Sequence, residues 1–535
     1  MPAVSVPLLL SGAVFTALVY FTTNHLGRRD TDSYLKKKPN FIIVLADDIG
    51  WGDLGLNRPG MNHTPNLDRM AQEGMRFTDF HSPASTCSPS RAALLTGRHG
   101  LRNGVTHNFA VGSVGGLPLN ETVLAEVLQA AGYYTAMIGK WHLGHRGPYH
   151  PSHRGFDYYF GIPYSNDMGC TDTPGYDIPS CPPCARDPLL DGDEHKECYS
   201  RIALPLFENL RIVEQPLNLW TLAEQYTQKA IDIIHHARAS GQSFFLYVAL
   251  AHMHVPLSAA SREPSITHID PYAASLEEMD SFVGRIKTAS DASDKENTLI
   301  WFTGDNGPWE KKCQFSGSVG PFLGRWQTDR GGSSAKRTTW EGGHRVPTIA
   351  YWPGKIPANV TSSALLRTLL SHSGLDIFPT VLSLAGESLP SQRQYDGIDV
   401  TKVLLHQSDT GHKSLFHPNS GAAGHFGDLQ TVRLGQYKAF YITGAAEACG
   451  GGTGQEMVHD PPLIFDLSRD EGEGVPLDSS SAEYSMVLER VEKERQAVLT
   501  DIAMDNVSRA DYAIDPSAAP CCDRSHVACR CRGLE

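Results

Sequence analysis

The sequence predicts a protein of the α/β class, with a large, mostly parallel or mixed central sheet flanked by helices. A smaller C-terminal antiparallel sheet with a helix is expected to follow it. Three observations support this fold. Several short runs are apolar at every position and alternate with helical patterns, as in sheets that are covered on both faces. These runs end abruptly in polar residues and glycine, and beyond about residue 408 the pattern changes to short strands and turns.

The N-terminus carries a targeting segment. Residues 1–24 hold no charged side chain, and residues 6–21 are almost continuously apolar. This pattern suits a secretory signal peptide, with an uncleaved membrane anchor as the alternative. A chain of 535 residues also favours more than one domain. We expect the main α/β domain at 38–410 and an α+β subdomain with a Cys-rich tail at 411–535.

Four apolar runs end in residues that could build a site. Residues 41–46 lead to Asp47 and Asp48, 134–139 to Lys140 and His142, 244–250 to His252 and His254, and 298–303 to Asp305 and Asn306. Ligands of open α/β sheets bind beyond the carboxyl ends of the strands. We therefore expect these side chains to converge.

Helices are expected between and after these strands. Thr122 can cap a helix over 123–131, and residues 221–239 form a longer amphipathic candidate. In the C-terminal part we expect strands over 429–433, 437–442 and 463–467, and a helix over 485–504 packed on them.

Cys87 stands at the start of another predicted helix. Pro89 suits the first turn, Thr96 continues the helix and Gly97 ends it. Free N–H groups and the helix dipole at this end favour an anion. Arg91 lies one turn further on and can point back at the same place. A structural cysteine is one alternative. Another is a phosphatase-like loop, whose chemistry needs Cys and Arg six positions apart rather than four.

The remaining cysteines indicate an oxidising compartment. Ten of the eleven can pair, which leaves Cys87 as the odd thiol. Zinc is the competing interpretation, but Cys181-x-x-Cys184 has no matching second half nearby. The ten are Cys170, Cys181, Cys184, Cys198, Cys313, Cys449, Cys521, Cys522, Cys529 and Cys531. Glycosylation sequons, which fit the same compartment, stand at Asn62, Asn120, Asn359 and Asn506.

The pairs Asp47-Asp48 and Asp305-Asn306 offer only oxygen ligands, which select Ca²⁺ or Mg²⁺. A single such pair could be ordinary turn chemistry. Two pairs at matching strand ends favour a metal site. The net charge of −13 argues against nucleic-acid binding, which needs a basic face.

The segment Cys87-x-Pro89-x-Arg91, continued by Ala-Ala-Leu-Leu-Thr-Gly97, resembles the signature of the sulfatase family. The motifs Gly-Lys140-Trp-His142-Leu-Gly and Lys336-Arg-Thr-Thr-Trp-Glu-Gly-Gly match the same family. The resemblance implies an alkaline-phosphatase-like fold and a Cys87 that is oxidised to formylglycine (3-oxoalanine). The formylglycine-generating enzyme would then be a partner during maturation. It also implies one Ca²⁺, with residue 87 as a further ligand, although the spacing does not exclude Mg²⁺.

The resemblance further implies roles for the surrounding residues. Lys140, His142, His254 and Lys336 would surround the sulfate, with His254 as the acid for the leaving group. Lys140, Ser165, His254 and Lys336 would contact the substrate. Asn166 stands where relatives often have histidine, which could alter the pocket.

The implied activity is that of a sulfuric ester hydrolase of the arylsulfatase type. Matches at 115–121 and in the Cys-rich tail point to lysosomal members, and hence to the 3-O-sulfate of glucosamine in heparan sulfate and to aryl sulfates. The lysosome is then the expected location, with secretion from the cell as the alternative. Two other functions stay open: a phosphatase or phosphodiesterase of the same superfamily, and an anion-binding relative whose Cys87 is never converted.

Overall fold

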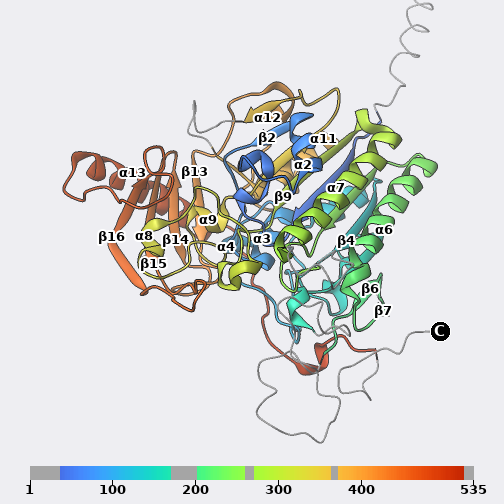
Figure 1. The fold of residues 1–535 in the computed structure, drawn as a ribbon, viewed down its shortest axis with the longest axis horizontal. Helices are drawn as coiled ribbons and strands as arrows, with labels where there is room; N and C mark the ends of the chain where they lie inside the picture. The colour runs from blue at the N-terminus through green and yellow to red at the C-terminus, as the bar shows by residue number, and fades with distance from the viewer. Residues whose placement is uncertain (1–36, 170–201, 259–269, 363–370, 523–535) are drawn as a thin grey trace, which may run out of the picture. The chain divides into compact units, whose positions relative to one another are not determined.

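A ten-stranded mixed sheet forms the centre of the computed structural model (Figure 1). The structure describes residues 37–169, 202–258, 270–362 and 371–522. Residues 39–535 form one unit, and residues 1–38 form another. The strands lie in the order β11-β2-β10-β9-β1-β8-β4-β5-β6-β7. Their bounds are Asn40–Ala46 (β1), Met75–Phe77 (β2), Tyr134–Gly139 (β4), Tyr158–Gly161 (β5), Leu206–Glu208 (β6), Arg211–Glu214 (β7), Phe244–Ala249 (β8), Thr298–Gly304 (β9), Thr348–Tyr351 (β10) and Val360–Ser362 (β11).

The middle of this sheet is parallel and buried on both faces. Strands β9, β1, β8, β4 and β5 are parallel neighbours. Antiparallel pairs involving β10 on one side and β6 and β7 on the other make the whole sheet mixed. Every residue of β1 is buried, which explains why its sequence is apolar rather than alternating. The predicted fold class is confirmed.

Helices cover both faces of the sheet. On one face Ile42 and Val44 pack with α2 (Pro65–Gln72), α6 (Leu219–Ser240) and α7 (Pro271–Asp294). On the other face Phe41, Ile43 and Leu45 pack with α3 (Cys87–Thr96), α5 (Leu124–Ala130), α11 (Ile377–Ala385) and α12 (Thr401–His406). Within the described segments no helix is both long enough and apolar enough to cross a lipid bilayer.

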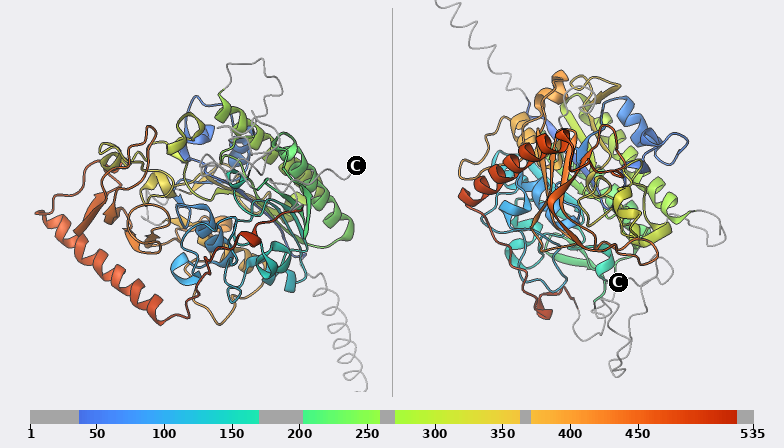
Figure 2. Two further views of the ribbon diagram at one scale, coloured as in Figure 1. Left: turned by 90° about the horizontal axis from the view of Figure 1, so that it is seen from below. Right: turned by 90° about the vertical axis from the view of Figure 1, so that its left-hand side faces the viewer.

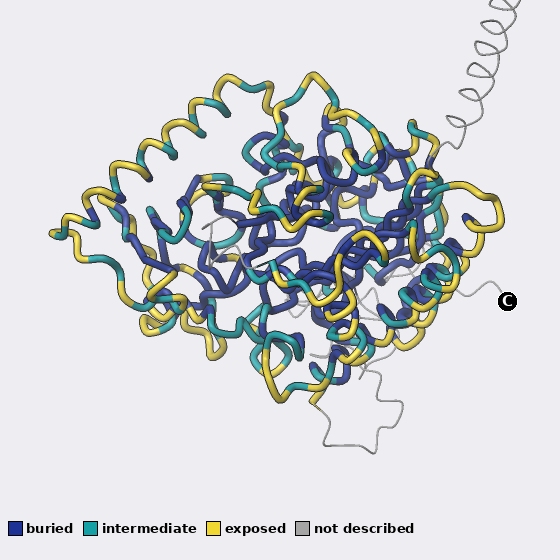
Figure 3. The backbone as a smooth tube through the Cα atoms, turned by 90° about the horizontal axis from the view of Figure 1, so that it is seen from above, coloured by how far each residue is buried: buried dark blue, intermediate teal, exposed yellow. Residues whose placement is uncertain are grey.

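A four-stranded antiparallel sheet follows in the C-terminal part (Figure 2). It contains β13 (Ser414–Pro418), β14 (Leu429–Leu434), β15 (Tyr437–Thr443) and β16 (Met457–Asp466). Helix α13 (Ala482–Met504) packs on it through Val487 and Val491, and its outer turns are exposed (Figure 3). Strand β16 begins earlier than the predicted 463, because Pro461 and Pro462 mask the strand pattern. Strand β13 was not predicted.

A buried network of charges connects the small sheet to the main part of the chain. Arg433 on β14 donates to both Asp79 oxygens, at 3.0 and 2.7 Å. Arg345 contacts Asp79 at 2.5 Å and Glu341 at 2.8 Å. Lys438 on β15 contacts Glu341 at 2.8 Å. Although burial alone would raise it, these guanidinium groups lower the pKa of Asp79 to about 2. The carboxylates are therefore neutralised by protein cations and do not need a metal.

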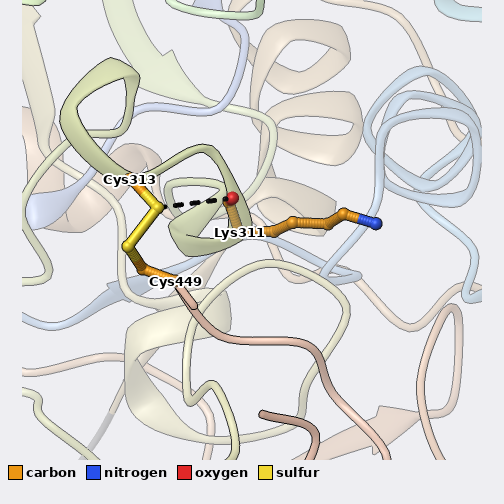
Figure 4. The surroundings of a disulfide bond; sticks show 3 residues. All are labelled: Lys311, Cys313 and Cys449. Atoms are coloured by element: carbon orange, nitrogen blue, oxygen red, sulfur yellow. Dashed lines mark hydrogen bonds between the residues drawn. A yellow bond between two sulfur atoms is a disulfide. The ribbon is translucent and has the colours of Figure 1, made fainter. Parts of the chain in front are cut away.

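A disulfide joins Cys313 to Cys449, which are 136 residues apart (Figure 4). Cys313 lies in a short 3-10 helix after β9, and Cys449 lies in the loop between β15 and β16. Cys521 and Cys522 are also disulfide-bonded. The other predicted partners, Cys170, Cys181, Cys184, Cys198, Cys529 and Cys531, lie outside the described residues, as does the leader at 1–24.

Candidate functional site

Four neighbouring parallel strands end at one edge of the central sheet. In register, Ala46 of β1 lies beside Gly304 of β9, and Gly139 of β4 lies beside Ala249 of β8. The backbone N–H of Asp305 donates to the Ala46 carbonyl at 2.9 Å. The residues that follow these strands are therefore gathered at one place, as the sequence predicted.

Helix α3 brings Cys87 to this edge. It begins at Cys87 and ends at Gly97, whose φ of 67° suits glycine. Cys87 is 1 % exposed and is a free thiol among the described cysteines. Its Sγ lies 3.5 Å from Oδ1 of Asp47. Burial raises the pKa of the Cys87 thiol to about 12, so it stays protonated and is a poor nucleophile in this form.

Arg91 pairs with the carboxylates of the site. Its Nε and Nη2 both donate to Oδ2 of Asp305, at 2.9 and 2.7 Å. Its Nη1 donates to the Lys140 carbonyl at 2.8 Å. Arg91 thus joins the cluster around residue 87 through the carboxylates: its Nη2 lies 2.7 Å from Asp305 and 3.5 Å from Asp47, whose other oxygen contacts the Cys87 Sγ.

The two acidic pairs offer free oxygen atoms at the centre of the cluster. Asp48 Oδ2 and Asn306 Oδ1 are buried and have no hydrogen-bond partner within the described part of the chain. Ligand atoms of Asp47, Asp48, Cys87 and His254 lie within 4.8 Å of one another. Buried polar atoms need partners. The carboxylate and amide oxygens of this cluster therefore fit a hard divalent cation.

Two lysines form a positive wall beside these oxygens. Lys140 Nζ lies 2.5 Å from Asp47 Oδ2, and Lys336 Nζ lies 2.6 Å from Asp48 Oδ1. Burial opposes ionisation of Asp47, but Lys140 and Arg91 outweigh it and hold the pKa of Asp47 well below its usual range. Burial opposes the charge of both lysines, but Asp47 beside Lys140 and Asp48 beside Lys336 raise their pKa values, so both keep their charge.

His142 is a neutral imidazole with a defined tautomer. Burial, followed by the charge of Lys140, lowers its pKa well below the usual value. Its Nε2 lies 3.0 Å from the Phe109 carbonyl, which can only accept, so Nε2 carries the proton. Its buried Nδ1 has no partner among the described residues. The ring therefore offers a lone pair at Nδ1 that can receive a proton.

His254 has the complementary arrangement. Its Nδ1 donates to the Val255 carbonyl at 2.6 Å, which leaves Nε2 directed at Ser165 Oγ, 3.4 Å away, and Asp48 Oδ2, 3.6 Å away. Ser165 Oγ also accepts from Lys140 Nζ at 3.2 Å. Asn166 donates to the backbone carbonyls of His254 and Pro256, so it braces this loop.

A cleft of about 310 Å³ opens onto this cluster. Part of its lining was not identified from the sequence. Those residues come from segments far apart in the chain, and apart from Arg337, which follows Lys336 in its motif, none was assigned a role from the sequence. They include His107, Asn108, Asp167, Trp309, Arg337 and Phe426. Trp309 lies under Lys336 Nζ, 4.6 Å from its ring centre.

The chain matches known proteins over most of its length. The profile of the Sulfatase family matches residues 39–387, and that of the C-terminal region of aryl-sulfatase matches residues 410–531. Arylsulfatase G of Canis lupus familiaris is 65% identical over 93% of this chain and 92% of its own. Arylsulfatase G of Homo sapiens is 60% identical over 98% of both chains, whereas human arylsulfatase A is 38% identical over 82% of this chain and 83% of its own. Among solved structures, PsFucS1 sulfatase from Pseudoalteromonas sp. superimposes with a TM-score of 0.72 at 25% identity, covering 94% of this chain and 97% of that chain.

Proposed function

The chain belongs to the sulfatase family and is a sulfuric ester hydrolase similar to arylsulfatase G, and on this basis we propose its catalytic mechanism and its substrate. We propose that Cys87 is converted to formylglycine by the formylglycine-generating enzyme. The substrate class is sulfated glucosamine, with the 3-O-sulfate of heparan sulfate as the natural ester and aryl sulfates as artificial ones. The proposed location is the lysosome, reached through the secretory pathway.

The observation that carries this proposal is the position of residue 87. It lies at the N-terminus of α3, 3.5 Å from Asp47, at the edge where Lys140, Lys336 and His254 meet. We propose Ca²⁺ as the cation, held by Asp47, Asp48, Asp305, Asn306 and the modified residue 87. When bound it would supply positive charge to the attacking oxygen and to the sulfate.

The first chemical step would use one of the two hydroxyls of hydrated formylglycine. Its oxygen loses its proton to solvent and attacks sulfur, and the S–O bond to the alcohol breaks. Lys140 and Lys336 stabilise the negative charge that develops on the sulfate oxygens. His254 in its doubly protonated form, with the Nδ1 proton held by the Val255 carbonyl, gives its Nε2 proton to the departing alcohol oxygen. Ser165, which contacts both Lys140 and His254, would orient the ester.

The second step would release the sulfate from residue 87. His142 takes the proton of the other hydroxyl through the free lone pair of its Nδ1. The carbon–oxygen bond to the sulfate then breaks, and the aldehyde forms again. Arg91 acts through Asp305, whose carboxylate it holds in place. A serine or cysteine at this position has no second hydroxyl, which explains why the chemistry needs the modification.

Peptide mass spectrometry of protein from a eukaryotic secretory host tests this function. We expect an aldehyde at residue 87 together with release of sulfate from an aryl sulfate. A thiol throughout, with no release of sulfate, would instead support an anion-binding relative. Hydrolysis of phosphate esters in preference to sulfate esters would support the phosphatase alternative.

Removal of the cation is expected to lower stability as well as activity. After treatment with a chelator, added Ca²⁺ should raise the free energy of unfolding by about 2.7 kcal/mol at a hundredfold excess over its Kd. Calorimetric unfolding measures this without substrate. Asn306→Ala, which removes a free buried oxygen, should abolish most of the effect, whereas Asn57→Ala should keep it. Equal stabilisation of both variants would contradict the proposed ligands.

The acid role of His254 predicts a dependence on the leaving group. His254→Gln should lower kcat about 10²- to 10⁴-fold for a sugar sulfate, whose alkoxide needs a proton. The loss should be much smaller for nitrophenyl sulfate, because nitrophenolate is stable without one. The exposed His235 provides the control, and His235→Gln should leave both rates unchanged. An equal loss for both esters would argue against an acid role.

The remaining parts of the proposal concern processing and organisation. The asparagines of the four sequons, Asn62, Asn120, Asn359 and Asn506, are exposed, as glycosylation requires. We retain the division into a leader at 1–24, a catalytic domain at 38–410 and a C-terminal subdomain at 411–535.

A further inference from the structure

A stack of aromatic rings contributes His107 and Phe426 to the lining of the cleft. The ring of Phe426 lies parallel to that of His107, with their centres 4.3 Å apart and their planes 17° from parallel. His107 stacks in turn on Tyr512 at 3.7 Å, and Tyr512 stacks on Phe109 at 4.8 Å. Phe426 is 51 % exposed, although phenylalanine gains most when it is buried. Its outer face is thus available to a ligand.

Three distant segments build this stack and hold it in place. His107 follows the short helix α4 (Gly100–Asn103), Phe426 lies between β13 and β14, and Tyr512 lies beyond α13. The Tyr512 Oη accepts from the backbone N–H groups of Thr106 and His107, at 2.9 and 3.2 Å. Partial burial lowers the pKa of His107, which favours the neutral ring that stacks well. The platform is therefore fixed before a ligand arrives.

The stack shares one cleft with the proposed sulfate-binding groups. His107 and Phe426 line it together with His142, His254 and Lys336. Trp309 also lines the cleft, 4.6 Å from Lys336 Nζ, so the lining combines cations, polar groups and aromatic rings. A ligand with a sulfate on one ring and a second ring attached would therefore meet two different kinds of surface.

We propose that Phe426 and His107 bind the sugar ring next to the sulfated one, and so make the enzyme selective for sulfated oligosaccharides over sulfated monosaccharides. This inference rests on the proposed function. A pyranose presents a face of C–H groups that packs on an aromatic ring, and its hydroxyls stay at the edge, in water. Binding energy from such a remote ring can be used in the transition state and raises kcat/KM.

Phe426→Ala tests this with two substrates: 3-O-sulfated glucosamine alone, and a disaccharide that contains it and a second sugar. Wild type should prefer the disaccharide. The variant should lose about five- to tenfold in kcat/KM for the disaccharide, as expected for one lost aromatic contact, and little for the monosaccharide. Phe426→Trp should retain the preference. Val475→Ala, at a valine that is 75 % exposed, serves as the control for truncating an exposed apolar side chain.

Two results would overturn the inference. One is an unchanged ratio of the two kcat/KM values in Phe426→Ala. The other is an equal loss for both substrates, which would mean that Phe426 supports the cleft in general. If the proposed function itself were wrong, the wild-type protein would hydrolyse neither substrate, which distinguishes that outcome from the two above. Thermal unfolding of each variant checks that the exposed substitution leaves the fold intact.

Discussion

Replacing Cys87 with serine should stop turnover while still allowing a single sulfate transfer. Serine supplies one hydroxyl at the start of α3, beside Asp47 and the two lysines, so it can attack sulfur. It lacks the second hydroxyl whose proton His142 would take, so the sulfate stays on the enzyme. We expect turnover to fall by a factor on the order of 10⁴ or more, as is typical when a nucleophile is lost.

Intact-protein mass spectrometry after incubation with substrate would show the trapped ester on Cys87→Ser. Cys87→Ala is the matched control, since it has no hydroxyl and should gain no sulfate. A serine variant that turns over at a rate near that of wild type would refute the two-hydroxyl mechanism. It would leave the sulfatase activity itself in place.

Replacing Arg433 with methionine should destabilise the protein by about 3–5 kcal/mol, although Arg433 does not line the cleft. Methionine keeps much of the apolar volume of the arginine side chain, but Asp79 loses one of its two guanidinium partners. Arg285→Met is the control: its partner Glu224 is exposed, and such pairs contribute about 0.2–1 kcal/mol. Denaturant unfolding measures both variants. Equally small losses of stability in Arg433→Met and Arg285→Met would show that the buried network does not stabilise the connection to the small sheet.

The pH dependence of this effect has a definite sign. The pKa of Asp79 is depressed in the folded state, to about 2. Its contribution to stability is therefore complete above its unfolded pKa of about 3.9 and is lost as the pH falls toward 2. The difference between wild type and Arg433→Met should accordingly persist at the mildly acidic pH of a lysosome.

Much of the fold could be predicted because the central strands are buried on both faces. Their apolar runs cannot alternate, and the polar residues after β1, β4, β8 and β9 mark where the strands end. The small sheet was predicted in part. Proline concealed the start of β16, and β13 has only two apolar residues, Leu415 and Phe416, before His417 and Pro418.

The chemistry-bearing residues could be predicted because each follows a strand or lies in a motif. The pairing of Arg91 with Asp305 could not be predicted, because a guanidinium selects its carboxylate in three dimensions. The aromatic part of the cleft was also missed. His107, Phe426 and Tyr512 come from three segments, and only the folded chain brings their rings together.

The burial of Cys87 also sets an order of events in the cell. With 1 % of its surface exposed, residue 87 is out of reach of any modifying enzyme once α3 has packed against the sheet. The proposed conversion would therefore have to happen on the growing or still unfolded chain. The disulfide from Cys313 to Cys449 can form only after synthesis has passed residue 449, long after residue 87 has emerged. Under this proposal the modifying enzyme competes with folding, and any change that speeds early packing around α3 should lower the fraction of active molecules.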